Sequence, residues 1–245
     1  MALFIVFEGG DGTGKTTQAK ALYERLRQRE SKYRDFVIYT QEPGGTAFGK
    51  LLRGILASVE GKPLVTLNKP SQLVLVEPPI GDEALPSITL GPATPRMELL
   101  YFLLSRAQLV EEVIQPNLQK GKIVICDRYA PSSIAYQGYG RGLDPKLIEQ
   151  ANSIATRGLK PDLIVLLDLE ADVGIARKWG TSKLERLEKE AIAFHQKVRE
   201  GYLKMAAEEP ERWLVIDAML PKRKIAEIIW DKVSKLLPSS PLREA

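Results

Sequence analysis

Residues 3–16 read Leu-Phe-Ile-Val-Phe-Glu-Gly-Gly-Asp-Gly-Thr-Gly-Lys-Thr, an apolar run followed at once by a glycine-rich loop. The loop matches the pattern G-x-x-x-x-G-K-[ST], and a helical pattern begins at its lysine. In a loop of this kind the glycines turn backbone N–H groups toward phosphate oxygens, the lysine reaches the β- and γ-phosphates, and the threonine ligates Mg²⁺. We therefore predict an ATP-binding P-loop rather than a glycine-rich turn with a chance lysine. Its residues are Gly9, Gly10, Asp11, Gly12, Thr13, Gly14, Lys15, Thr16 and Thr17.

Apolar runs typical of strands alternate with helical patterns along the rest of the chain. The predicted strands are residues 3–7, 36–40, 123–126, 163–169 and 213–216, and the predicted helices are residues 15–29, 49–56, 97–119, 145–156, 184–207 and 222–236. This alternation predicts an α/β fold, a three-layer α/β/α P-loop NTPase with a five-stranded parallel sheet. Ligands of such sheets bind beyond the carboxyl ends of the strands.

The length of 245 residues fits a single domain, which we place at residues 1–238. Residues 58–96 interrupt the alternation, and their seven prolines exclude a long helix there. This insertion could be a hairpin flap or an ordered Ω-like loop. Residues 239–245 carry little apolar material and are expected to fray.

Composition excludes several classes of protein. No apolar run approaches the roughly 18 residues that span a bilayer, and no basic leader precedes the first strand. The net charge of +4 is spread along the chain without a long basic block. The single cysteine, Cys126, excludes an internal disulfide and suits a reducing compartment. We expect a cytoplasmic protein with small-molecule ligands and with neither a nucleic acid nor a membrane as partner.

A carboxylate ends the predicted strand at residues 123–126. Asp127 stands where an acidic residue of a P-loop enzyme reaches the metal beside the loop threonine, so Thr16 and Asp127 are the predicted Mg²⁺ ligands. The alternative is that Asp127 only caps the next turn. No Asn-Lys-x-Asp string is present, which argues against a GTPase.

Several strings, in matching order and spacing, resemble the thymidylate kinases of the bacterial type. They are residues 7–18, Glu42-Pro43-Gly44-Gly45-Thr46, Asp127-Arg128-Tyr129, Ala135-Tyr136-Gln137-Gly138, Lys160-Pro161-Asp162-Leu163, Leu167-Asp168-Leu169 and Glu185-Arg186-Leu187-Glu188. The resemblance covers nearly the whole chain outside residues 58–96. It implies transfer of the γ-phosphoryl of ATP to dTMP, with Mg²⁺ as cofactor, in a homodimer. Another (deoxy)nucleoside monophosphate kinase and a nucleotide-dependent binding module are the alternatives.

The resemblance also implies roles for particular residues. Arg53 and Arg128 would hold the acceptor phosphate, a task that suits their permanently charged bidentate guanidinium groups. Phe102 and Arg106 lie four residues apart on one helix face and would hold the thymine, although periodicity alone is equally compatible with a core position for Phe102. Tyr136 would lie under the deoxyribose and exclude a 2′-hydroxyl. The remaining predicted acceptor residues are Asp11, Glu42, Ser132, Ser133 and Gln137.

By the same resemblance, residues 176–187 form a helical lid. Arg177, Lys183 and Arg186 are its candidates for contact with ATP, and we place Arg186 with Lys15, Asp11 and Arg128 among the catalytic residues. A charge-rich helix face is the alternative for any one of them. The lid carries fewer arginines than is usual for the family, and Gln41 stands where an arginine is common. His195, the only histidine, lies far from every motif along the chain and is expected to be a surface or packing residue.

Overall fold

A five-stranded parallel sheet with the strand order β2-β3-β1-β4-β5 forms the centre of the protein, as the alternating pattern predicted. The computed structural model describes residues 2–28, 30, 33–58, 93–179 and 190–237. The strands are β1 (Leu3–Glu8), β2 (Val37–Gln41), β3 (Ile123–Asp127), β4 (Leu163–Asp168) and β5 (Trp213–Asp217). β1 lies between β3 and β4, so the P-loop leaves the middle of the sheet at its carboxyl edge.

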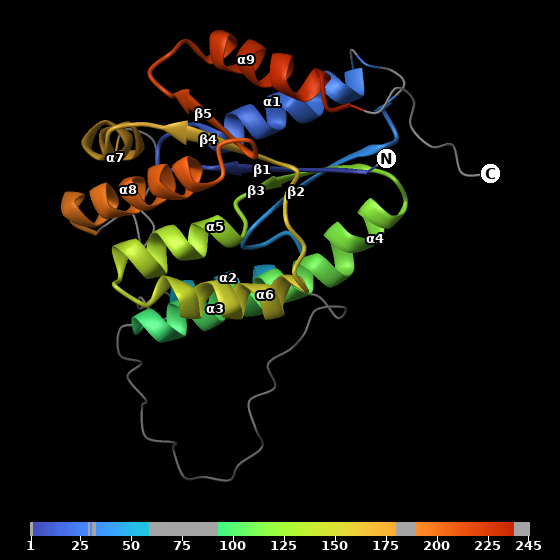
Figure 1. Ribbon diagram of the computed structural model, residues 1–245. Coiled ribbons are helices and arrows are strands. Elements are labelled where there is room, and N and C mark those ends of the chain that lie inside the picture. Colours follow the sequence, from blue (N-terminus) through green and yellow to red (C-terminus); the bar gives the residue numbers. More distant parts are fainter. Residues whose placement is uncertain (1, 29, 31–32, 59–92, 180–189, 238–245) are drawn as a thin grey trace.

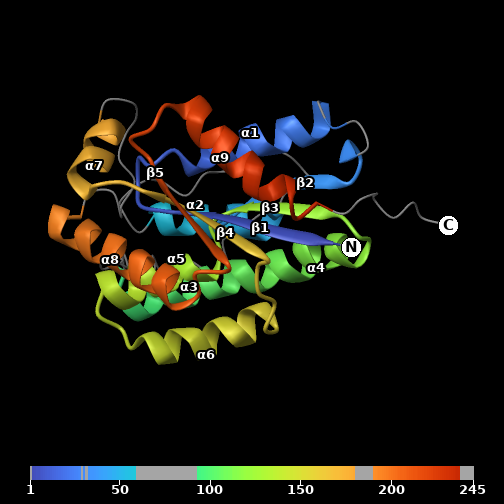
Figure 2. The same ribbon diagram turned by 45° about the horizontal axis from the view of Figure 1, so that its top comes forward.

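Side chains of β1 alternate between two helical layers, as expected for a strand that is buried on both faces. Leu3, Ile5 and Phe7 pack against α1 (Lys15–Gln28) and α9 (Lys222–Ser234). Phe4 and Val6 face the opposite cluster, which includes residues of α8 (Ile192–Glu208) and of the helix around residue 110. Figures 1 and 2 show α1 and α9 covering one face of the sheet while α3, α6 and α8 lie on the other. The three-layer architecture is therefore confirmed.

Most predicted helices are present with bounds that differ by a few residues, but the helix predicted at residues 184–207 begins only at Ile192, as α8. They include α2 (Ala47–Ser58) and α6 (Pro145–Thr156). The pattern predicted at residues 97–119 is divided into α3 (Pro95–Leu109), a π-helical segment η2 (Val110–Ile114) and α4 (Gln115–Gln119). Pro116 accounts for a disturbance here, because proline lacks the N–H that would bond one turn back and its ring crowds that carbonyl.

Two helical segments were missed by the sequence analysis: α5 (Ala130–Ser133) and the π-helical segment η3 (Ile134–Gly140). Of α7 (Ala171–Trp179), the prediction of a helical lid covered only residues 176–179. Glycines at positions 138, 140 and 174 lower the helix propensity of η3 and α7. Glycine is nevertheless required at position 140, because a Cβ there would lie 2.6 Å from the ring of Phe194 in α8. Tertiary packing against α8 therefore overrides the low helix propensity of η3.

Several predictions fall outside the described residues. These are most of the insertion, the predicted frayed tail at residues 239–245, and the part of the predicted lid that contains Lys183 and Arg186. Residues 176–179 of that lid are the last turn of α7. Among the helices that the structure describes, none combines the length and the apolar composition that crossing a membrane requires.

Candidate active site

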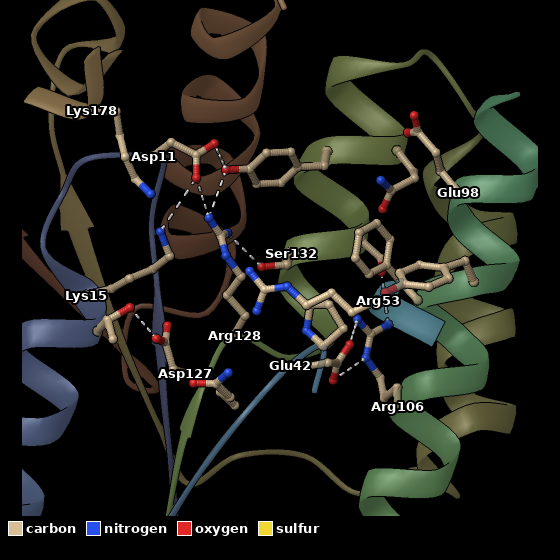
Figure 3. A pocket seen from close by; sticks show the side chains of 18 residues that line it. Asp11, Lys15, Glu42, Arg53, Glu98, Arg106, Asp127, Arg128, Ser132 and Lys178 are labelled. Carbon is tan, nitrogen blue, oxygen red and sulfur yellow. Dashed lines mark hydrogen bonds and ion pairs between the residues drawn. The ribbon is translucent and has the colours of Figure 1, made fainter. Parts of the chain in front are cut away.

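A pocket of about 380 Å³ opens at the carboxyl edge of the sheet (Figure 3). Most of the residues predicted from the sequence line it: Asp11, Lys15, Thr16, Glu42, Arg53, Phe102, Arg106, Asp127, Arg128, Ser132, Ser133, Tyr136 and Gln137. It also contains residues that the sequence analysis did not place there: Gln41, Pro43, Glu98, Tyr101 and Lys178. The other predicted P-loop residues do not line this pocket: Gly9, Gly10, Gly12, Thr13, Gly14 and Thr17.

The P-loop holds its lysine inward. Lys15 Nζ donates to the carbonyl of Gly10 at 2.9 Å and lies 4.0 Å from the carboxylate of Asp11. Burial, together with the charge of Arg128, lowers the pKa of Lys15 to about 8. A phosphate group entering the loop would bring negative charge to a buried cation, so it would stabilise the protonated lysine.

The P-loop also packs backbone to backbone against α7. Gly12 has a φ of +75°, and a Cβ there would lie 2.0 Å from the carbonyl oxygen of Gly174. A Cβ on Gly174 would in turn lie 2.4 Å from the carbonyl oxygen of Asp11. Only glycine permits this approach at both positions. The helix that leads to the predicted lid is thereby fixed against the phosphate loop.

The predicted metal ligands lie together. The Thr16 hydroxyl donates to Asp127 Oδ2, whereas Asp127 Oδ1 is buried and has no hydrogen-bond partner among the described residues. A buried carboxylate oxygen without a partner is costly unless a ligand satisfies it. Oxygen ligands beside a phosphate loop suit a hard divalent cation such as Mg²⁺. Thr16 and Asp127 therefore fit such an ion.

Arg128 is the centre of the polar cluster that faces the P-loop. Its Nη2 donates to Asp11 Oδ1 at 2.9 Å and to the Tyr136 hydroxyl at 3.1 Å, and that hydroxyl also donates to Asp11 Oδ2 at 2.9 Å. The backbone of Arg128 is left-handed, with a φ of 72°. A residue other than glycine in this conformation is strained and is held there by its surroundings, as at many functional sites.

Asp11 remains ionised in this cluster. Burial alone would raise its pKa, but the charges of Arg128 and Lys15 and the hydroxyl of Tyr136 lower the pKa below its usual value. Asp11 thus balances two cations at the junction of the P-loop and the pocket.

Arg106 and Glu42 form a buried ion pair in the pocket wall. The guanidinium of Arg106 is 1% exposed and donates to both carboxylate oxygens of Glu42. Its other donors reach Ser133 Oγ, Asn152 Oδ1 and the carbonyl of Tyr129. All five N–H groups of the guanidinium therefore have acceptors within the chain. A base carbonyl at Arg106 would have to share one of these donors.

The other predicted acceptor residues surround this pair. Phe102 is partly buried and lines the pocket, with its ring 4.9 Å from that of Tyr101 in an edge-on contact. Gln137 is 1% exposed, and its Nε2 has no hydrogen-bond partner among the residues that the structure describes. Figure 3 shows Arg53 reaching from α2 into the same cavity.

Three basic residues of α7 and α8 differ from the expectations. Arg177 donates to the carbonyl of Ala218 and to Met219 Sδ, at the end of β5, and does not line the pocket. Lys178, one residue further along, does line it and extends toward Lys15 and Asp11 (Figure 3). His195 is buried, and its Nδ1 lies 4.0 Å from Asp11 Oδ2. The prediction of a surface or packing position far from the motifs missed this contact, because no spacing along the chain shows that α8 crosses the P-loop.

A phosphate loop whose Lys15 and Thr16 line the same pocket as the cations Arg53 and Arg128 provides for a donor nucleotide and a phosphorylated acceptor. The chain is a P-loop nucleotide kinase. Its residues 7–68 and 78–229 match the family model described as thymidylate kinase. The chain belongs to the thymidylate kinase family.

Curated relatives and a solved structure agree with this assignment. The thymidylate kinase of Geotalea uraniireducens is 40% identical over 223 residues, which are 89% of each chain. That of Solidesulfovibrio magneticus is 41% identical over 242 residues, covering 96% of this chain and all of the relative. The crystal structure of thymidylate kinase from Ehrlichia chaffeensis superimposes with a TM-score of 0.67 at 29% identity, covering 95% of this chain and 98% of that one.

Proposed function

We propose that this enzyme transfers the γ-phosphoryl group of ATP to dTMP, giving dTDP and ADP for dTTP synthesis. The observation that carries the proposal is the arrangement of Arg53 and Arg128 in one pocket with Lys15 and Thr16 of the P-loop. Two permanently charged guanidinium groups suit a dianionic acceptor phosphate. The acceptor oxygen would then face the terminal phosphate of a nucleotide held by the P-loop.

The reaction needs no general base from the protein. The second pKa of a phosphate monoester is about 6, so the acceptor is already mostly a dianionic nucleophile at neutral pH. The residues contribute alignment and charge neutralisation: Lys15 on the transferring group, and Arg53 and Arg128 on the acceptor. Mg²⁺, for which Thr16 and Asp127 would be the ligands, supplies further neutralisation of phosphate charge when it is bound. The lid residues Arg177, Lys183 and Arg186 remain candidates for additional contacts with ATP.

The base and sugar of the acceptor would occupy the far side of the pocket. We assign the base to Phe102 and Gln137, whose unpaired amide nitrogen is a donor suited to a pyrimidine carbonyl. Tyr136 would lie against the sugar, as the resemblance to the family implies. Its hydroxyl is bonded to Asp11 and Arg128, so its ring is fixed in the pocket wall. A fixed ring excludes a 2′-hydroxyl by steric clash. Arg106, Glu42 and Ser133 would complete the wall of this pocket.

An acceptor panel tests the proposal. We expect phosphorylation of dTMP with a kcat/KM at least about 100-fold higher than that of dCMP, AMP or the ribose counterpart of dTMP, because each of these leaves pocket groups unpaired or clashes. The products are identified by chromatography after incubation with ATP and Mg²⁺. dUMP lacks only the methyl group, so its kcat/KM should be lower than that of dTMP by only roughly 10-fold. Hydrolysis of ATP without transfer to any acceptor would instead favour the nucleotide-dependent binding module.

We also propose a homodimer formed through α3. Leu99 and Leu103 are buried within the protomer, whereas Leu100 and Leu104, on the adjacent face of the helix, are 64% and 50% exposed. Two large exposed apolar side chains one turn apart favour an interface.

Sedimentation checks this prediction. The wild-type chain should have the mass of a dimer at micromolar concentration, and Leu104→Glu should shift it to a monomer, because a charge buried in an interface is costly. Leu236→Glu, which alters an exposed leucine just after α9, should leave the dimer intact. A monomeric wild-type chain would exclude this interface.

We propose a cytoplasmic location and a single kinase domain over residues 1–238 for the enzyme.

A further inference from the structure

Next to Arg128, outside the lining of the pocket, lies a buried carboxylate. Glu8, the last residue of β1, has no exposed surface and does not line the pocket. Its Oε1 accepts the backbone N–H of Tyr129 at 2.9 Å. Its Oε2 lies 2.7 Å from the Ser132 hydroxyl and 2.8 Å from the Tyr202 hydroxyl, within hydrogen-bond distance of both.

These contacts hold Arg128 from both ends. The backbone N–H of Arg128 donates to the carbonyl of Phe7 at 3.0 Å, and the backbone N–H of Tyr129 donates to Glu8. The end of β1 therefore fixes the left-handed backbone of Arg128. The guanidinium Nη1 lies 3.2 Å from Ser132 Oγ and 3.4 Å from the Tyr202 hydroxyl. Both hydroxyls are oriented by Glu8. The carboxylate thereby acts on the position of Arg128 without touching the pocket.

The number of protons in this cluster is informative. Ser132 Oγ and the Tyr202 hydroxyl also lie 2.9 Å from each other, so three oxygens form three mutual contacts. Each hydroxyl carries a single proton. If Glu8 were ionised, two protons would serve three contacts, and one pair of buried oxygens would face each other with no proton between them. A proton on Glu8 Oε2 supplies the third, and each oxygen then donates once and accepts once around the ring.

The surroundings of Glu8 shift its pKa in both directions. Burial raises its pKa, whereas the charge of Arg128 and its three hydrogen bonds lower the pKa, and the net effect is a rise above the usual value. The other titratable neighbours that interact with it are Lys15 of α1, Glu42 after β2 and Cys126 of β3. The direction of the shift agrees with the proton count.

We propose that Glu8 is a positioning residue for Arg128 and that it is protonated in the ligand-free enzyme, where it closes a hydrogen-bonded ring with Ser132 and Tyr202. The inference rests on the proposed function, in which Arg128 holds the acceptor phosphate. A neutral Glu8 orients the guanidinium without neutralising it. The positive charge of Arg128 is then balanced only in part, by Asp11, and remains available to a dianionic acceptor.

Three variants separate the two parts of the proposal. Glu8→Ala removes the carboxyl group, and Tyr202→Phe removes only one oxygen of the ring. Glu8→Gln resembles the protonated acid, because its carbonyl can still accept from Tyr129 while its amide donates to the hydroxyls. Tyr129→Phe is the matched control: it too removes a buried tyrosine hydroxyl, but one that donates to the carbonyl of Leu159, outside the ring.

The readouts are the Kd of dTMP measured by calorimetry without ATP, and the KM values of both substrates. We expect Tyr202→Phe and Glu8→Ala to weaken dTMP binding by about tenfold or more, because each leaves buried polar groups unpaired behind Arg128. The KM of ATP should change less than about threefold. Glu8→Gln and the Tyr129→Phe control should stay within about threefold of wild type for dTMP.

Each part of the proposal would be contradicted by a different result. Normal dTMP binding by a folded Tyr202→Phe variant would overturn the positioning role, and Tyr202→Phe remains informative if Glu8→Ala does not fold. Loss of binding in Glu8→Gln equal to that in Glu8→Ala would overturn the protonated state. A wild-type enzyme that binds no dTMP would refute the proposed function instead.

Stability and infrared spectra give an independent test of the protonated state. The folded-state pKa of Glu8 is raised, so its contribution to stability is complete below the usual glutamate value of 4.5 and is lost as the pH rises through the folded-state pKa. The Glu8→Gln variant should lack this decline. The difference spectrum between wild type and Glu8→Gln near neutral pH should contain the C=O band of a protonated carboxyl group, and a carboxylate band alone would overturn the assignment.

Discussion

Replacing Lys15 with alanine is expected to lower kcat by roughly 10²–10³-fold, the usual cost of removing one preorganised group that stabilises charge in the transition state. Lys15 is the one cation in the sequence of residues 9–17, and its ammonium contacts the carbonyl of Gly10 and the carboxylate of Asp11. The fold should persist, because the substitution removes a buried charge and leaves the core unchanged. Steady-state assays with saturating ATP and dTMP measure the loss.

The control is Lys20→Ala, which alters an exposed lysine of the same helix outside the pocket. It should retain wild-type kcat and KM. The pH dependence of ATP binding is a second readout: since the pKa of Lys15 is about 8 in the ligand-free enzyme, ATP affinity should decline as the pH rises above that value. A Lys15→Ala variant that keeps more than about a tenth of wild-type kcat would show that the P-loop is not the donor site.

Breaking the Arg106–Glu42 pair should produce the largest loss of stability. Arg106→Met leaves the buried carboxylate of Glu42 without its cation, together with unpaired acceptors on Ser133 and Asn152. Removing one partner of a buried ion pair typically costs about 3–5 kcal/mol. For a chain of this size, that corresponds to a fall in Tm of roughly 6–20 °C. Chemical and thermal denaturation measure it.

The matched control is the double variant Glu42→Met with Arg106→Met, which replaces both charges by apolar groups and should lose less stability than Arg106→Met alone. The single variant should also respond to pH. Burial already raises the pKa of Glu42 to about 7 while Arg106 opposes the rise, and removing Arg106 raises it further. The folded state then binds more protons than the unfolded state, so the destabilisation should be smaller at pH 5.5 than at pH 8. Equal stability of the single variant and wild type would mean that the pair is not a structural element.

The sheet and the P-loop could be predicted because local chemistry determines them. The apolar run ending at Glu8, the glycines that follow it and the carboxylate at Asp127 each give their own signal in the chain. The π-helical segment η3 could not be predicted in this way. Its glycines are poor helix formers, and its conformation depends on contacts with Phe194 and Val198 of α8, over 50 residues away in the chain.

The residues of the pocket also divide into those that the sequence could place there and those that only the fold brings together. Phe102 was equally compatible with a core position by periodicity, and the resemblance placed it in the pocket, where the structure also has it. Lys178, Glu98 and Tyr101 belong to no motif, so only the arrangement of α3 and α7 could place them there. Glu8 was visible as part of a motif, but its partner Tyr202 is 194 positions away along the chain, and nothing in local sequence pairs the two.

The contact between Gly12 and Gly174 affects how motion can pass through the protein. Two main chains meet there without an intervening side chain, and a side chain is the part of a protein that most easily absorbs a displacement by changing rotamer. We therefore expect a shift of the P-loop around a phosphate group to displace α7 as well. A nucleotide bound at the P-loop would then change the position of the last turn of α7, which carries Lys178.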